Sequence, residues 1–266
     1  MVRAISNTFE RLRGEGKKAF IPFITVGDPD LDTTVRIVRE LERANSHIVE
    51  LGIPFSDPLA DGPVIQRASE RALRHGYRLA DYFEAVRRIR CESSIPLVLF
   101  TYFNPILRYG LEDFARDARS AGVDGLLVTD MSPEEANEYC FCLDRYGLDP
   151  IFLVAPTSSS IRIKKICACS RGFIYVVSRT GVTGAQDRLS EALLPTLGRV
   201  REQTQLPVAV GFGISRPEQV RAIWKVADGA VVGSAIVAQV EKEAGAPDLP
   251  ARVGSFCRWL TGGGDG

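Results

Sequence analysis

The segment AFIPFITVGDPDLDTTVRIVRELERANSHIVELG, residues 19–52, contains the pattern that decides the fold. It begins with an apolar run over Ala19–Thr25, continues with apolar residues at helical spacing over Leu31–Ala44, and ends with a second apolar run over His47–Gly52. A short apolar strand, an amphipathic helix and another apolar strand are typical of a parallel βαβ unit. The segment therefore predicts two neighbouring parallel strands with a helix packed against them.

The same alternation continues along the rest of the chain. Several of the apolar runs are apolar on both faces, as expected of a parallel sheet whose two faces are both covered. Such runs occur eight times, at Ala19–Thr25, His47–Gly52, Ile95–Thr101, Val123–Thr129, Asp149–Ala155, Gly172–Ser178, Pro207–Gly211 and Asp228–Gly233. Eight strand–helix units in about 250 residues predict an α/β fold, the eight-stranded parallel (β/α)8 TIM barrel. No linker divides the sequence, so we expect residues 1–266 to form a single barrel domain.

The helix signals agree with this fold. Acidic residues open a helix expected over Leu111–Ala121, and Ser132 followed by Pro133 predicts a capped helix start. An extra N-terminal helix is expected over Ile5–Arg13, where it would close the floor of the barrel. A doubly wound open sheet is the competing fold, but no Gly-x-Gly-x-x-Gly follows the first strand.

Composition excludes several classes of function. The 33 basic and 33 acidic side chains cancel, so no summed positive field would hold nucleic acid or an anionic membrane. The longest apolar stretch, Ile95–Phe103, is far shorter than the ~20 residues that cross a bilayer. The first sixteen residues contain no apolar signal core. We therefore expect a soluble cytoplasmic protein that binds neither nucleic acid nor membrane.

The six cysteines give no sign of a disulfide framework or a metal site. Cys140 and Cys142 form one Cys-x-Cys pair and Cys167 and Cys169 another, and both pairs fall in expected helices. Residues two apart on a helix point to nearly opposite sides, which is wrong for a pair of zinc ligands. We expect reduced, partly buried thiols, and we assign the chain no metal and no cofactor.

A carboxylate near the end of the second strand is the first candidate for catalysis. In this fold the active site lies at the carboxyl ends of the strands, and Glu50 stands there inside an apolar run, on the same face as Ile48. A buried carboxyl group resists ionisation, which suits a group that must give and recover a proton near neutral pH. The structural alternative is a glutamate paired with a buried arginine or lysine.

The loop after that strand, Ile53–Pro63, contains three prolines and two aspartates and is therefore stiff. Asp57 and Asp61 could each simply belong to a turn. Together with Glu50 they concentrate acid at one side of the barrel mouth, where two carboxylates in different environments can work as an acid and a base.

Glycine-rich loops follow the last three strands, at 178–185, Gly211–Ser215 and Gly233–Ala235. Glycine-rich backbone after strands seven and eight, ending at a helix N-terminus, is the usual phosphate site of such barrels, because free amides and the helix dipole favour an anion. Tight turns without a ligand are the alternative interpretation. No lysine stands at the carboxyl end of a strand, and neither His47 nor His75 is placed for catalysis. The reaction type that remains is proton transfer by carboxylates on a phosphorylated substrate.

Five motifs resemble the tryptophan synthase alpha chain family, in the right order over nearly the whole chain: AFIPFITVGDPD, VELGIPFSDPLADGPVIQ, VVSRTGVTGA, VGFGIS and VVGSAIV. The resemblance implies a lyase that cleaves indole-3-glycerol phosphate to indole and glyceraldehyde 3-phosphate in tryptophan biosynthesis. It also implies a partner, the pyridoxal-phosphate-dependent beta chain, in an α2β2 tetramer. Two segments depart from the family pattern, Ala44–His47 and Thr129–Ser132, and both lie outside the catalytic motifs.

The resemblance assigns roles to individual residues. Glu50 becomes the catalytic acid and base, and Asp61 the carboxylate that stabilises positive charge at the indole nitrogen. The phosphate falls to Gly184, Gly211, Phe212, Gly213, Gly233 and Ser234. The indole ring would lie among Phe23, Phe100, Tyr102 and Leu127, and Tyr175 matches an active-site tyrosine, although core packing would explain it nearly as well.

Two further expectations concern the loops at the barrel mouth. The composition of the loop after the sixth strand suits a hinged lid that closes with the Thr183 hydroxyl near Asp61. The segment Ile53–Pro63, with Asp57, is where we expect the beta chain to dock. Two other functions remain open at this point: another phosphate-binding barrel, such as a sugar-phosphate isomerase, and a subunit that only activates its partner.

Overall fold

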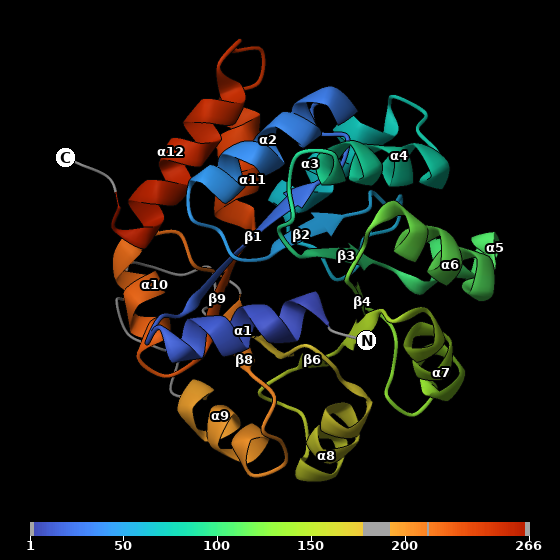
Figure 1. Cartoon of the computed structure of the whole chain (residues 1–266), viewed down its shortest axis with the longest axis vertical. Coiled ribbons are helices and arrows are strands. Elements are labelled where there is room, and N and C mark those ends of the chain that lie inside the picture. Colours follow the sequence, from blue (N-terminus) through green and yellow to red (C-terminus); the bar gives the residue numbers. More distant parts are fainter. Residues whose placement is uncertain (1–2, 178–191, 212, 264–266) are drawn as a thin grey trace.

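Parallel strands form the inner wall of a barrel and helices surround it (Figure 1). The computed structural model describes residues 3–177, 192–211 and 213–263. In that part of the chain the strands pair in the order β5-β4-β3-β2-β1-β9-β8-β7-β6. The strands are β1 Ala19–Thr25, β2 Val49–Gly52, β3 Leu97–Thr101, β4 Gly125–Val128, β5 Asp149–Ile151, β6 Leu153–Val154, β7 Ile174–Val177, β8 Val208–Gly211 and β9 Gly229–Val232. The predicted α/β barrel is confirmed.

The helices follow the strands in alternation, with α1 before the first strand and α12 after the last helix of the repeat. They are α1 Ala4–Gly14, α2 Leu31–Arg43, α3 Pro63–Leu73, α4 Leu79–Arg90, α5 Phe103–Tyr109, α6 Leu111–Ala121, α7 Asn137–Tyr146, α8 Ser160–Cys169, α9 Leu193–Arg201, α10 Pro217–Trp224, α11 Ser234–Lys242 and α12 Leu249–Thr261. The sequence pattern predicted α6 with these bounds and α2 to within one residue.

One predicted strand is divided. The run expected over Asp149–Ala155 forms β5, which pairs with β4, and β6, which pairs with β7, with Phe152 between them. Nine strands therefore stand where eight apolar runs were expected. The barrel closes through this segment because the chain changes its neighbour at Phe152, whose carbonyl still accepts a hydrogen bond from the Tyr175 amide at 3.2 Å.

Alternation along the strands separates an inner core from an outer one. Ile48, just before β2, belongs to the apolar cluster inside the barrel, whereas Val49 and Leu51 belong to the larger cluster between strands and helices. Because side chains alternate along a strand, Glu50 points into the barrel on the same side as Ile48. Burying both strand faces accounts for the apolar runs in the sequence.

Helix α1 lies across one end of the barrel, as predicted (Figure 1). Its Ile5, Phe9 and Leu12 are buried in the inner cluster, and the Phe9 ring lies 5.7 Å from that of Phe173. Arg3 pairs with the buried Asp149 at the same end. The helix thus seals the amino ends of the strands and leaves the opposite end for the site.

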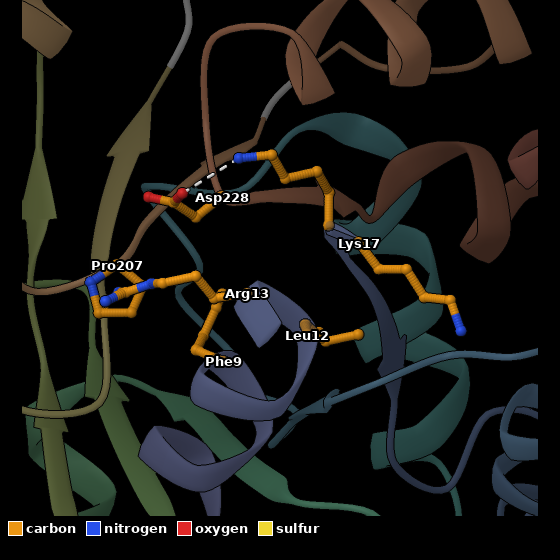
Figure 2. Close-up of a pocket in the computed structure, with 7 residues that line it drawn as sticks. Phe9, Leu12, Arg13, Lys17, Pro207 and Asp228 are labelled. Atoms are coloured by element: carbon orange, nitrogen blue, oxygen red, sulfur yellow. Dashed lines mark hydrogen bonds and ion pairs between the residues drawn. The ribbon is translucent and has the colours of Figure 1, made fainter. Parts of the chain in front are cut away.

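A small cavity remains beneath this helix (Figure 2). It measures about 30 Å³ and is lined in part by Arg13, Pro207 and Asp228. Lys18 donates to the Asp228 carboxylate at 3.3 Å. The cavity has room for little more than a water molecule, so it is no substrate site.

The expected helix start at Ser132 and Pro133 is wrong. Helix α7 begins at Asn137, and residues 133–135 form a turn instead. The Ser132 hydroxyl donates to the Glu135 carboxylate at 2.9 Å and caps no helix. A local contact between these two side chains has replaced the cap that the sequence suggested.

The six cysteines are free thiols. Cys140 and Cys142 face different neighbours, the carbonyl of Cys169 and the carboxylate of Glu112, as expected of positions two apart on a helix. In the described part of the chain no three histidine, cysteine or carboxylate side chains gather where they could hold a metal ion. Within the same residues, every helix is too short or too polar to span a bilayer.

Candidate active site

Glu50 is the most unusual titratable group inside the barrel. Its side chain is 0% exposed, and neither carboxylate oxygen has a hydrogen-bond partner among the described residues. The structural alternative, a glutamate paired with a buried arginine or lysine, thus finds no support within the described ranges. A buried polar group without partners costs free energy, and such groups gather at functional sites.

Burial sets the protonation of this group. It raises the pKa of Glu50 from an ordinary 4.5 to about 8, because the charged form loses its hydration and gains no compensating partner. At pH 7 the side chain is therefore mostly a neutral acid, and losing its proton remains within reach. This is the property that the sequence predicted for an acid that must also act as a base.

Asp61, in the loop after β2, is held in a different environment. Its carboxylate accepts a hydrogen bond from the Tyr102 hydroxyl at 3.1 Å, and that hydroxyl in turn accepts one from the Ala60 amide at 3.0 Å. Partial burial raises the pKa of Asp61, and the Tyr102 hydroxyl counteracts this by stabilising the charged form. The two carboxyl groups are thus held in unlike surroundings: that of Glu50 is fully buried and has no partner among the described residues, whereas that of Asp61 is hydrogen-bonded and partly buried.

The backbone on both sides of Asp61 is also fixed. The Asp61 amide donates to the Pro58 carbonyl at 3.0 Å, and the Gln66 side chain donates to the Asp61 carbonyl at 2.9 Å. Gln66 lies in the first turn of α3, which has Gly62 as its N-cap and Pro63 as its first residue. The start of α3 therefore holds the loop that carries the carboxylate.

Asp57 does not join the two carboxylates. Its side chain is exposed and accepts a hydrogen bond from the Ser56 hydroxyl at 2.6 Å, which is a turn contact. Leu59, in the same loop, is 95% exposed. This part of the loop is exposed to solvent.

Aromatic and apolar side chains line the space beside Glu50. Phe23 is the register partner of Glu50 on β1, and Phe100 is the register partner of Leu127 on β4. The rings of Phe23 and Phe100 meet edge to face, with centroids 5.2 Å apart. A flat apolar ring fits between such walls.

Tyr102 has a role that the sequence does not reveal. The sequence suggests only an apolar wall, yet the Tyr102 hydroxyl holds Asp61, and its ring stacks on Phe55 with centroids 4.9 Å apart. Gln66 is a second contact that the sequence pattern did not predict. Its place in the first turn of the helix after Asp61-Gly62-Pro63 is the signal that would have found it.

Tyr175 lies on the inner face of β7, opposite Glu50. It is buried, and its pKa is raised well above its usual value, mainly by burial and then by the nearby charge of Glu50. A Cβ atom on Gly211 would lie only 2.7 Å from the Tyr175 Cζ atom. Gly211 is thus required here for space, because the phenol ring occupies the room that a side chain would need.

The candidate phosphate end is built around the start of α11. Gly233 is the N-cap of this helix, Ser234 is its first residue, and no described side chain caps it. A Cβ atom on Gly233 would be 3.6 Å from the Phe23 side chain, so the helix start lies next to the ring pocket. Gly213 has a φ of +74°, a conformation that favours glycine. Free amides at such a helix start favour an anion.

Three predicted site residues, Thr183, Gly184 and Phe212, lie outside the described residues, as does the expected lid. Among the other predicted residues, the structure brings Phe23 next to Phe100 and to Gly233, and Tyr102 next to Asp61. A hollow of about 510 Å³ between α6 and α7 contains none of the predicted site residues. Both histidines also lie elsewhere, since His47 accepts the Phe20 amide at 3.0 Å and His75 contacts the Pro29 carbonyl at 2.6 Å.

Comparison with known proteins points to one family. The family model for the tryptophan synthase alpha chain matches residues 9–255. The tryptophan synthase alpha chain of Solibacter usitatus is 49% identical over 259 residues, 97% of each chain. That of Geobacter sp. strain M21 is 51% identical over 259 residues, again 97% of each.

Solved structures are similar over nearly the whole chain. Tryptophan synthase subunit alpha from Legionella pneumophila strain Paris has a TM-score of 0.89 at 36% identity, covering 98% of this chain and 99% of its own. A chain of the tryptophan synthase complex from Pyrococcus furiosus has a TM-score of 0.84 at 36% identity, covering 92% and 98%.

Proposed function

The chain belongs to the tryptophan synthase alpha chain family, and we propose that Glu50 and Asp61 are the carboxylates with which it works. It is a carbon–carbon lyase of tryptophan biosynthesis that carries out the alpha reaction, the retro-aldol cleavage of indole-3-glycerol phosphate to indole and glyceraldehyde 3-phosphate. This reaction needs a group that gives and recovers a proton, and a second group that stabilises positive charge on the ring. The two carboxyl groups divide these tasks.

Glu50 provides the proton cycle. With a pKa of about 8 it begins as a neutral acid and protonates the indole carbon that bears the glycerol phosphate chain. The resulting carboxylate then takes the proton of the neighbouring hydroxyl as the carbon–carbon bond breaks and the aldehyde forms. The electron pair of that bond returns to the ring, and Glu50 regains its proton, so no net proton is consumed.

Asp61 stabilises the charge that this protonation creates. Adding a proton to the ring carbon places positive charge on the indole nitrogen. A carboxylate that accepts a hydrogen bond from the indole N–H group lowers the energy of that state. Burial raises the pKa of Asp61, and the Tyr102 hydroxyl, at 3.1 Å, opposes this by stabilising the charged form of the carboxylate. A group whose only task is to remain negative is well served by this hydrogen bond.

The substrate's two ends fit two parts of the site. The indole ring lies among Phe23, Phe100, Tyr102 and Leu127, and Tyr175 bounds the pocket beside Glu50. The phosphate lies near the start of α11, at Gly211, Gly213, Gly233 and Ser234, and the resemblance adds Gly184 and Phe212. The closeness of Gly233 to Phe23 supports this arrangement, because one small molecule can then reach both parts.

The unpartnered carboxyl group of Glu50 is the observation that carries the assignment, and Glu50→Gln tests it. The amide has nearly the same shape but cannot cycle a proton, so we expect cleavage to fall by ~10²-fold or more with little change in the Michaelis constant. Steady-state cleavage of indole-3-glycerol phosphate by the purified chain measures it. Near-normal turnover would make Glu50 structural and refute the assignment.

The family works in complex with a beta subunit, and solved relatives include such a complex. We propose an α2β2 assembly with the pyridoxal-phosphate-dependent beta chain, docked over Ile53–Pro63, where Leu59 is 95% exposed. Indole would be lost if released, so direct transfer to the partner favours this contact, and we place the assembly in the cytoplasm. Adding the cognate beta chain should accelerate cleavage by ~5- to 100-fold, and Leu59→Asp should weaken this response. No acceleration at saturating partner would refute the coupling.

A further inference from the structure

Charged side chains from three elements form a continuous network beside the candidate site. The Arg71 guanidinium, on α3, donates through Nε and Nη2 to the two carboxylate oxygens of Asp28, both at 2.8 Å. Its Nη1 donates to Glu241, on α11, at 2.7 Å. Arg67 adds two further bonds to Glu241, at 2.9 and 2.8 Å. We call Asp28, Arg71 and Glu241 the Arg71 clamp.

The clamp is directional and partly shielded from water. Asp28 is only 4% exposed, and the Arg71 side chain 26%. A two-pronged arginine–carboxylate pair fixes orientation as well as distance, which a lysine in the same place could not do. Because Arg71 faces a second carboxylate with its remaining nitrogen, it ties the loop after β1, helix α3 and helix α11 to one another.

The two helices joined by the clamp begin at opposite parts of the site. Helix α3 starts two residues after Asp61, and Arg71 lies in its last turn. Helix α11 starts at Ser234, the candidate phosphate end, and Glu241 lies in its last turn. The clamp therefore joins the far ends of two helices whose near ends hold the carboxylate and the phosphate.

Apolar packing alone would leave the relative position of these helices loosely defined. The helices contact each other through Ala68 and Val237, which pack with Phe23 in a small cluster of their own. Arg71 lies three residues after Ala68, and Glu241 four after Val237, so the clamp continues the same helix faces. Hydrophobic contact between small side chains is non-directional. The ion pairs add the direction that stops one helix from sliding along the other.

We propose that Arg71 is a positioning residue, which holds α3 against α11 so that Asp61 and the phosphate-binding start of α11 keep the spacing that indole-3-glycerol phosphate spans. The inference rests on the proposed function, because it takes the substrate to occupy both parts at once. It predicts that loss of the clamp weakens the binding of ligands that bridge both parts of the site and leaves the affinity for ligands that contact only one part unchanged.

Ligands of two kinds test this in the full-length protein. Indole and glycerol 3-phosphate each occupy one part, whereas indole-3-propanol phosphate, which lacks the reacting hydroxyl groups, spans both. For Arg71→Met we expect the dissociation constants of the one-part ligands to change by less than ~2-fold while that of the bridging ligand rises ~10-fold or more, and kcat/KM falls at least as much. Titration calorimetry below the melting temperature measures all three constants.

Two further variants separate positioning from general damage. Arg87→Met removes an exposed pair with Glu84 within α4, far from the site, and should leave all constants unchanged. Glu241→Gln weakens only the link between α3 and α11 and leaves Arg71 bonded to Asp28, so it should show the same split between ligands. If Arg71→Met fails to fold, this variant decides the question.

The possible results distinguish the clamp from the proposed function. Equal weakening of all three ligands, or no weakening of the bridging ligand, in Arg71→Met and Glu241→Gln would overturn the clamp and leave the proposed function intact. Wild-type protein that binds glycerol 3-phosphate but neither indole nor the bridging ligand would refute the proposed function, and the clamp with it.

Discussion

Replacing Glu50 by glutamine should make the protein more stable at high pH while it abolishes efficient cleavage. The carboxyl group is fully buried without a partner among the described residues, and its pKa is raised from 4.5 to about 8. Because the pKa of Glu50 is higher in the folded state than in the unfolded state, the ionised form of this group destabilises the folded state relative to the neutral form. Its ionisation therefore costs the wild type stability as the pH rises from about 4.5 to 8, and this cost is constant above 8.

The size of the effect follows from the two pKa values. Each unit of difference corresponds to about 1.4 kcal/mol, so between pH 6 and pH 9 the wild type should lose on the order of 2–3 kcal/mol through this one group. Glutamine is neutral throughout and loses nothing. The free energy of unfolding of Glu50→Gln minus that of the wild type should therefore rise by this amount over the same range.

Urea unfolding of both proteins at pH 6, 7, 8 and 9 measures this difference. Other titrating groups are present in both chains and cancel in the subtraction. Glu84→Gln, which changes an exposed side chain on α4, serves as the matched control. A difference for Glu50→Gln that stays constant within about 0.5 kcal/mol would show that Glu50 ionises as freely in the folded chain as in the unfolded one. The account of its burial and its role as an acid would then both fail.

Three further predictions concern single side chains. Burial lowers the pKa of His47 to about 4, so the folded state resists its protonation, and this group should cost on the order of 1 kcal/mol of stability per pH unit between pH 6.5 and 4. The melting temperature of the wild type should therefore fall relative to that of His47→Gln between pH 7 and 5, a comparison in which the titration of Glu50 cancels. Gly211→Ala places a Cβ atom 2.7 Å from the Tyr175 Cζ atom and should cost about 1–3 kcal/mol in urea unfolding, and an unchanged midpoint would contradict the close packing. Tyr102→Phe removes the donor that lowers the pKa of Asp61, so the acid limb of the pH–rate profile should move to higher pH, whereas an unmoved limb would detach Tyr102 from Asp61.

The sequence determined the features that depend on local pattern. Alternating apolar runs and amphipathic helices fixed the barrel, because strand and helix periods are set by backbone geometry and each unit covers its own part of the sheet. The position of Glu50 on the same face as Ile48 followed from that alternation, and the structure places it inward as expected. The stiffness of Ile53–Pro63 and the helix start at α3 could also be inferred from proline and glycine.

Only the tertiary structure decided which side chains meet across the barrel. The pairing of Arg71 with Glu241, 170 residues away, and of Tyr102 with Asp61 depends on how α3, α11 and β3 are brought together, and no local pattern encodes those distances. The local pattern of the fifth apolar run is compatible with one continuous strand, and closure of the barrel determined that it divides into two strands at Phe152. The raised pKa of Glu50 has the same origin. Its neighbours along the chain predicted burial, but the absence of a hydrogen-bond partner among the described residues depends on which side chains the surrounding strands bring near it.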